Sequence, residues 1–238
     1  MSRICYSSEI YNLATEDIMS LPDSPLNFKS PAETVTVLLG NRQKWNDKTC
    51  ITPDTLLSGR KLVERALAAR EQYIPVQIAF TSEMSAYNFW APIIRVLRYK
   101  YKKYSSRSYH MRPSEIRERK LERGMRTAEN AYIFSNPKYK MAKAERRKMY
   151  DKLVSSMRQN GYDENYPLDI MLCRNMGVKD TLNQGHHRLG VAIECGIERV
   201  PVIFSAAGQA PKFMQPLCRL IAEMNMWFKH LANRAKKS

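Results

Sequence analysis

The sequence predicts a small α/β domain with a mixed sheet, preceded by a largely helical N-terminal extension and followed by a long C-terminal helix. Three observations lead to this prediction. Of the 238 residues, 44% are hydrophobic, a proportion typical of globular proteins. Short runs rich in β-branched residues alternate with longer segments whose apolar residues recur at helical spacing. Glycine or asparagine stands at the end of several of these segments, where the chain should turn.

The N-terminal extension, residues 1–130, is expected to change from α/β to helical structure. Residues 1–32 have little periodicity and are expected to form an irregular arm. The β-branched run at residues 34–39 predicts a strand that stops at a Gly-Asn turn. Asp54 can cap a helix over residues 55–73, because leucines and alanines recur there at helical spacing.

The next two segments of the extension are predicted to be a strand at residues 75–80 and a helix at residues 82–104. The helix would begin at a serine that suits an N-cap, and its apolar and aromatic residues interleave with cations. Such a segment fits three surfaces: a membrane-surface helix, a nucleic-acid face with stacking tyrosines, or a core-facing stripe with a solvated basic back.

Charge is concentrated in the middle of the chain. The formal net charge is +16, and the stretch from Arg95 to Lys148 contains 18 Lys and Arg residues against five acidic residues. The extension is therefore basic after residue 94. A surplus of this size favours an anionic partner, so residues 89–148 are a candidate surface for nucleic acid or for an anionic membrane.

Residues 131–210 are predicted to form the compact α/β domain. Its expected elements, in chain order, are a helix at 145–160, strands at 166–172 and 178–182, a helix at 186–195 and a strand at 200–204. A long final helix is expected over residues 211–235, within the C-terminal segment 211–238. It runs through apolar residues at helical spacing and finishes in basic residues, which favour a helix C-terminus.

Cysteine usage and hydropathy predict a cytoplasmic protein, possibly peripheral on the inner face of a membrane. The five cysteines are odd in number and include no C-x-x-C pair, which argues against a disulfide framework or a zinc ribbon. No run approaches the roughly 18 to 20 apolar residues that span a bilayer. His110 has no partner at metal-ligand spacing and is expected to be a surface or packing residue.

The corner at residues 183–188 carries the strongest chemical signal. A strand that ends in Asn183, Gln184 and Gly185 and turns directly into a helix leaves backbone N–H groups unpaired at the helix N-terminus, where the dipole favours an anion. The first helical turn then contains His186, His187 and Arg188, and cations are unfavourable there unless an anion compensates them. A phosphate-binding corner is predicted; a solvated surface turn is the alternative.

The same residues resemble a known family. The run from Leu182 to Leu189, followed by Gly196-Ile197 and Val200-Pro201-Val202-Ile203, is similar to the core of the ParB/sulfiredoxin superfamily. The resemblance covers residues 132–207 and implies a small mixed-sheet domain. Sulfiredoxins have a cysteine where this chain has His186, which disfavours sulfinic acid reduction. The free serine kinase branch resembles this chain best, with Gln184 here in place of that branch's aspartate.

The resemblance implies a site for ATP or CTP in which Asn183, Gln184, Gly185, His186, His187 and Arg188 hold the phosphates and Mg²⁺ bridges them. It implies a phosphotransferase acting on a small or envelope-related hydroxyl acceptor. The candidate catalytic residues are Glu145, Asp180 and His187. Glu145 is the one acid between Asn130 and Asp151, and Asp180 could replace the carboxylate that Gln184 lacks. A DNA-binding ParB-like regulator without catalysis, and a scaffold without chemistry, are the alternatives.

Overall fold

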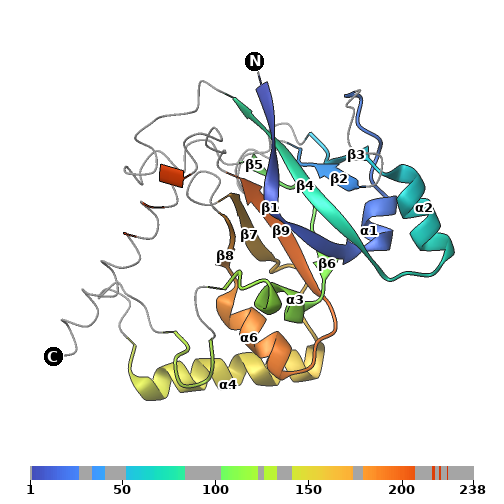
Figure 1. Ribbon diagram of the computed structural model, residues 1–238. Coiled ribbons are helices and arrows are strands. Elements are labelled where there is room, and N and C mark those ends of the chain that lie inside the picture. Colours follow the sequence, from blue (N-terminus) through green and yellow to red (C-terminus); the bar gives the residue numbers. More distant parts are fainter. Residues whose placement is uncertain are drawn as a thin grey trace.

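The computed structural model is a mixed α/β structure built on two small mixed sheets (Figure 1). It describes residues 2–26, 34–40, 52–83, 103–122, 126–132, 141–173 and 179–206, and four positions further on: 216, 217, 220 and 224. Within these residues, no helix is long and apolar enough to cross a membrane.

The first sheet has the strand order β1-β4-β2-β3. It consists of β1 (Ser2–Ala14), β2 (Val35–Leu38), β3 (Thr55–Ser58) and β4 (Tyr73–Glu83). β1 runs antiparallel to β4, β2 runs parallel to β4, and β3 closes the sheet antiparallel to β2. The short helix α1 (Thr15–Met19) and the longer α2 (Arg60–Ala68) contact each other beside this sheet (Figure 1). The predicted strands at 34–39 and 75–80 are thus confirmed.

The prediction of an irregular N-terminal arm is wrong, because residues 2–14 form the long strand β1. Its odd-numbered residues point inward, and Cys5, Tyr11 and Leu13 are buried. The alternation is hard to read in the sequence because the inward position 7 is a serine, whereas the apolar Ile10 is 43% exposed. The polar inward residues are satisfied by partners far along the chain, which the sequence pattern does not reveal.

The predicted helix at residues 55–73 begins too early. Residues 55–58 form β3, and α2 begins only after Gly59, whose φ of 91° turns the chain out of the sheet. A Cβ at Gly59 would lie 2.7 Å from the Cα of Val35, so the strand packs too closely for a side chain there. Asp54 does not cap α2. Its buried carboxylate instead accepts hydrogen bonds from the N–H of Gly40 at 2.6 Å and from the hydroxyl of Tyr109 at 2.7 Å.

The second sheet has the order β5-β9-β7-β8, with β6 also paired to β9. Its strands are β5 (Lys103–Tyr104), β6 (Tyr109–Met111), β7 (Leu168–Cys173), β8 (Lys179–Gln184) and β9 (Val200–Ala206). β7 and β9 run parallel, and the other pairs are antiparallel. The helices α3 (Pro113–Glu118), α4 (Lys143–Asn160) and α6 (His186–Glu194) lie together at one end of this sheet (Figure 1).

All the elements predicted for residues 145–204 are confirmed, with ends shifted by a few residues. The region before residue 131 also contributes strands β5 and β6 to the second sheet, so it is not the largely helical extension that was expected. Of the helix predicted at residues 82–104, both described ends are strand, and residues 84–102 lie outside the described part. The long C-terminal helix lies mostly outside it too, with only Pro216, Leu217, Leu220 and Met224 described as helical.

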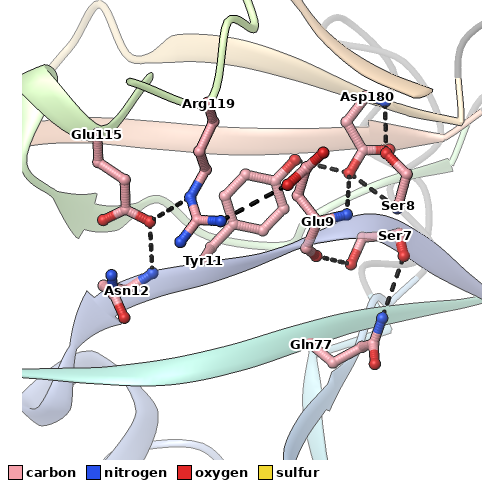
Figure 2. A network of polar contacts seen from close by, with 9 residues as sticks. All are labelled: Ser7, Ser8, Glu9, Tyr11, Asn12, Gln77, Glu115, Arg119 and Asp180. Carbon is pink, nitrogen blue, oxygen red and sulfur yellow. Dashed lines mark hydrogen bonds and ion pairs between the residues drawn. The ribbon is translucent and has the colours of Figure 1, made fainter. Parts of the chain in front are cut away.

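The two sheets share one hydrophobic core. The ring of Tyr11 from β1 packs on Phe204 from β9 with centroids 5.0 Å apart, and both side chains are fully buried. A polar network joins β1 to β4, β8 and α3 (Figure 2). Within it, Asp180 of β8 accepts hydrogen bonds from the N–H groups of Ser8 and Glu9 and from the hydroxyl of Tyr11. Since β1 is bulged between residues 6 and 10, successive amides turn toward this one carboxylate.

Candidate functional site

The predicted corner is a tight turn from β8 into α6. Gly185 has a φ of 96°, in the left-handed region, and a Cβ on it would lie 2.3 Å from Cδ2 of Leu168. Both the backbone conformation and the packing on β7 therefore require glycine. No side chain of the described residues caps α6 at this end, and its first turn contains no acidic residue. The positive end of the helix dipole is consequently uncompensated there, which is the condition for binding an anion.

His187 faces the short segment 126–132 rather than solvent. Its Nε2 accepts a hydrogen bond from the main-chain N–H of Tyr132 at 2.8 Å, and the two rings stack with centroids 4.2 Å apart. Burial, together with the nearby positive charge of Arg126, lowers the pKa of His187 to about 4. The imidazole is thus neutral at physiological pH. It can position the loop, but it does not supply a positive charge to a phosphate.

Segment 126–132 approaches the helix very closely. A Cβ on Gly190, in the middle of α6, would lie 2.4 Å from the carbonyl oxygen of Arg126. The Nε of Arg126 is buried and has no hydrogen-bond partner among the described residues. Because a buried donor without an acceptor is unfavourable, the Nε of Arg126 is available to an anion at the corner.

Arg188 supplies a second guanidinium on the other side of the turn. Its Nη1 donates to the carbonyl oxygens of Tyr166 and Pro167, which precede β7, and its guanidinium carbon lies 5.8 Å from the centre of the Tyr166 ring. The Tyr166 residue is 61% exposed, so the pair stands at the surface. Beside it, the Tyr162 hydroxyl donates to the Tyr166 carbonyl, and burial raises the pKa of Tyr162 to about 12.

A carboxylate that the sequence analysis did not select also lies at the corner. Asp169 of β7 is directly opposite Gln184 in the strand register, and its residue is only 7% exposed. Its Oδ2 accepts a 2.6 Å hydrogen bond from Nδ2 of Asn183, and its Oδ1 accepts a 2.7 Å hydrogen bond from the Ser205 hydroxyl. A signal existed in the sequence: Asp169 is the one charged residue within the apolar run 168–172.

The other predicted site residues lie in different settings. Asn183 and His186 are half-buried, and Gln184 is exposed. Glu145 is exposed in the first turn of α4, and no hydrogen bond or ion pair of the described residues joins it to the corner. Asp180 is 1% exposed and holds β1 against β8, as described above (Figure 2). The structure thus brings together residues 183–188, adds Arg126 and Asp169 to them, and directs the Asp180 carboxylate into the core.

Comparisons with known proteins give no match that could indicate a function, so the corner at residues 183–188 is the main evidence. No family model, curated protein or solved structure matches the chain. Among the described residues, no group of three or more His, Cys, Asp or Glu side chains is arranged to hold a metal ion by itself. Any cation at the corner would therefore need ligands from a bound molecule or from solvent.

Proposed function

We propose that the chain is a nucleotide-binding protein with a ParB/sulfiredoxin-like second domain, whose corner at residues 184–188 holds the triphosphate of ATP or CTP. The observation that carries the proposal is the uncapped N-terminus of α6, which follows a glycine whose left-handed backbone other residues adopt only with strain. The order helix, strand, strand, helix, strand, with the last strand parallel to the first, supports the resemblance noted in the sequence.

The charges around the corner support phosphate as the ligand. Arg188 and Arg126 provide two guanidinium groups, and guanidinium binds phosphate oxygens through paired, charge-assisted hydrogen bonds. In the structure, Arg188 is bound to two main-chain carbonyl oxygens, which are weaker acceptors than a phosphate. A phosphate at the N-terminus of α6 can therefore replace the carbonyl oxygens of Tyr166 and Pro167 as the acceptor of the Arg188 hydrogen bonds.

The reaction that fits such a site is phosphoryl transfer to a small or envelope-related hydroxyl acceptor. In this reaction the protein mainly positions the reactants and neutralises the developing charge. Mg²⁺, when bound together with the nucleotide at residues 184–188, would supply positive charge that stabilises the leaving phosphate group. His187 contributes by holding segment 126–132 in place, because its neutral ring already accepts a hydrogen bond from Tyr132. Glu145 remains a candidate base.

Nucleotide binding is tested by thermal unfolding and by calorimetric titration of the whole chain with ATP, CTP and GTP. A ligand at about 100 times its Kd should stabilise the fold by about 2.7 kcal/mol. We expect Arg188→Ala to lose this stabilisation. The matched control is Arg158→Ala, which removes an exposed arginine on α4 whose partner is Glu194. Wild-type protein that no nucleotide stabilises, or an Arg188→Ala variant that binds as the wild type does, would contradict the proposal.

The DNA-binding alternative rests on the basic stretch between Arg95 and Lys148. A second pair of variants distinguishes it from nucleotide binding at the corner. Binding to DNA would weaken steeply with salt and would be lost when Arg98 and Lys102, which lie outside the described residues, are neutralised. Nucleotide binding at the corner would be unaffected by those two changes.

A further inference from the structure

The bulge at the end of β8 brings a second set of polar groups beside the corner. Asp169 pairs with Gln184, and its neighbour Ile170 pairs with Leu182, so that Asn183 is the extra residue of the bulge. In such a bulge two residues of one strand lie opposite a single residue of the other. Asn183 and Gln184 are thus both opposite Asp169, at the point where the chain enters α6.

The Asp169 carboxylate is held in one orientation but is not saturated. Asn183 and Ser205 each donate one hydrogen bond to it, one to each oxygen. An ionised carboxylate offers about four lone-pair positions, so each oxygen keeps one for a further ligand. Carboxylates that bind metal ions are commonly oriented by outer hydrogen bonds of this kind.

A neighbouring hydroxyl on the same face of the sheet has no hydrogen-bond partner among the described residues. Thr181 pairs with Met171, which lies two residues after Asp169 on β7, so the Thr181 side chain is on the same face of the sheet as that of Asp169. The residue is 9% exposed, and its Oγ1 is buried without a hydrogen-bond partner among the described residues. A buried hydroxyl in this state is unfavourable and indicates that a ligand or solvent molecule completes the cluster.

We propose that Asp169 is the protein ligand of the divalent cation that accompanies the nucleotide, and that it supplies the carboxylate which position 184 lacks. This inference rests on the proposed function. The donors on this face, a carboxylate, the Gln184 amide and the Thr181 hydroxyl, are the oxygen ligands that Mg²⁺ prefers. Mg²⁺ is usually held by one or two carboxylates together with phosphates and water, which agrees with a single acid at this corner.

The experiment measures the affinity for ATP by calorimetry, once with MgCl₂ and once with EDTA. For wild-type protein we expect Mg²⁺ to increase the affinity for ATP at least about tenfold. Changes to the groups around a metal site commonly alter metal affinity by at least this factor. Asp169→Asn keeps the size of the side chain: its Oδ1 can still accept the hydrogen bond from Asn183, while its Nδ2 can donate to the Ser205 hydroxyl instead of accepting from it. We expect it to bind ATP normally in EDTA and to lose the tightening by Mg²⁺. Asp151→Asn, on the exposed side of α4, is the matched control and should retain it.

The outcomes separate the two proposals. If Arg188→Ala abolishes ATP binding in EDTA but Asp169→Asn retains the tightening by Mg²⁺, the metal inference fails and nucleotide binding stands. If wild-type protein binds ATP neither with Mg²⁺ nor with EDTA, both fail.

Should Asp169→Asn not fold, Gln184→Glu serves instead, because residue 184 is exposed and tolerates the change. A second carboxylate opposite Asp169 should strengthen Mn²⁺ binding in the presence of ATP at least about fivefold, as measured by electron paramagnetic resonance. Unchanged Mn²⁺ affinity would overturn the inference.

Discussion

The main-chain N–H of Tyr132 donates a hydrogen bond of 2.8 Å to Nε2 of His187, and the two rings stack at an interplanar angle of 9°. This contact fixes the chemistry of the imidazole. Since Nε2 is an acceptor, the ring proton is on Nδ1 and the histidine is neutral. Protonation would convert the acceptor into a donor that faces another donor, and it would place a charge beside Arg126. The contact therefore joins the corner to segment 126–132 in a pH-dependent way.

Acid should destabilise the fold through His187. Burial and Arg126 lower its pKa from 6.5 to about 4, so between these values the unfolded chain binds more protons than the folded one. The free energy of unfolding contributed by this residue is fully present above pH 6.5 and is lost as the pH falls toward 4. Because solvent screens the half-buried ring, we expect the free energy of unfolding to fall by about 1–2 kcal/mol, which is less than the energy equivalent of the whole pKa shift.

The measurement is urea unfolding of wild type and His187→Gln at several pH values. The glutamine keeps an acceptor for the Tyr132 N–H but does not titrate. The variant should therefore be less stable than wild type at pH 7, because the ring stacking is lost. Its free energy of unfolding should change less than that of wild type as the pH falls from 6.5 to 4. Parallel pH curves for the two proteins would show that His187 is not the group responsible.

The turn at Gly185 should tolerate no side chain. Gly185→Ala places a Cβ against Leu168 and also forces alanine into the left-handed region. Left-handed backbone costs about 1–2 kcal/mol, and overpacking a core costs a further 1–3 kcal/mol. Gly196→Ala is the matched control, since its φ is 68° but nothing lies within 4 Å of the added Cβ. We expect chemical denaturation to show a loss of about 3 kcal/mol for the first variant and about 1 kcal/mol for the second. Equal losses would mean that the contact with Leu168 relaxes freely.

Most of the second sheet could be predicted from the sequence because its signals are local. The helices α4 and α6 end at Gly161 and Gly196, both with positive φ, and the strands β7 and β9 are mostly apolar runs. The corner at residues 184–188 could be located for the same reason. The prediction that it binds an anion rests on the order strand, glycine, helix, and this order is visible without tertiary information.

The remaining features depend on partners far along the chain. β1 could not be recognised because its inward Ser7 hydroxyl is bound by β4 and the main-chain N–H of Glu9 is bound by β8, about 70 and 170 residues away in sequence. Asp54 has the sequence context of a helix cap, but Tyr109 and Ser106 bury it as a bridge between the two sheets. Asp180 is a candidate catalytic acid in the sequence because it lies only three residues before Asn183. Its side chain points into the core because strand residues alternate between faces.

His110 should contribute more to stability than a surface histidine does. Its Nδ1 lies 3.0 Å from Oδ2 of Asp17 and its Nε2 lies 2.9 Å from Oε2 of Glu164, so one ring joins α1, β6 and the loop before β7. We expect His110→Ala to lower the free energy of unfolding by about 1–2 kcal/mol, because the ring loses its packing and at least one hydrogen bond to a carboxylate. Glu164→Gln, at a side chain that is 58% exposed, should cost less than about 0.5 kcal/mol. A His110→Ala variant as stable as wild type would show that the loop is held by other contacts.

The Asp180 carboxylate should be among the most sensitive polar positions in the chain. It accepts hydrogen bonds from the Ser8 N–H at 3.0 Å, the Glu9 N–H at 3.3 Å and the Tyr11 hydroxyl at 2.7 Å (Figure 2). Asp180→Ala removes the acceptor of all three donors at the junction of the two sheets. Hydrogen bonds to a charged group contribute about 1.5–3 kcal/mol each, and water can replace part of this at the half-buried amides, so we expect a loss of about 3 kcal/mol.

Tyr11→Phe separates the hydroxyl from the rest of this junction. It retains the packing of the ring on Phe204 and removes only the donor to Asp180, so we expect a loss of about 1–2 kcal/mol. Urea unfolding of both single variants and the double variant forms a cycle. The double variant should lose less than the sum of the singles, since the Tyr11–Asp180 contact is counted in each. Additive losses would show that the carboxylate acts on the β1 amides alone. The control variant is Asp163→Ala, in the exposed loop before β7, which should leave the stability within about 0.5 kcal/mol of wild type.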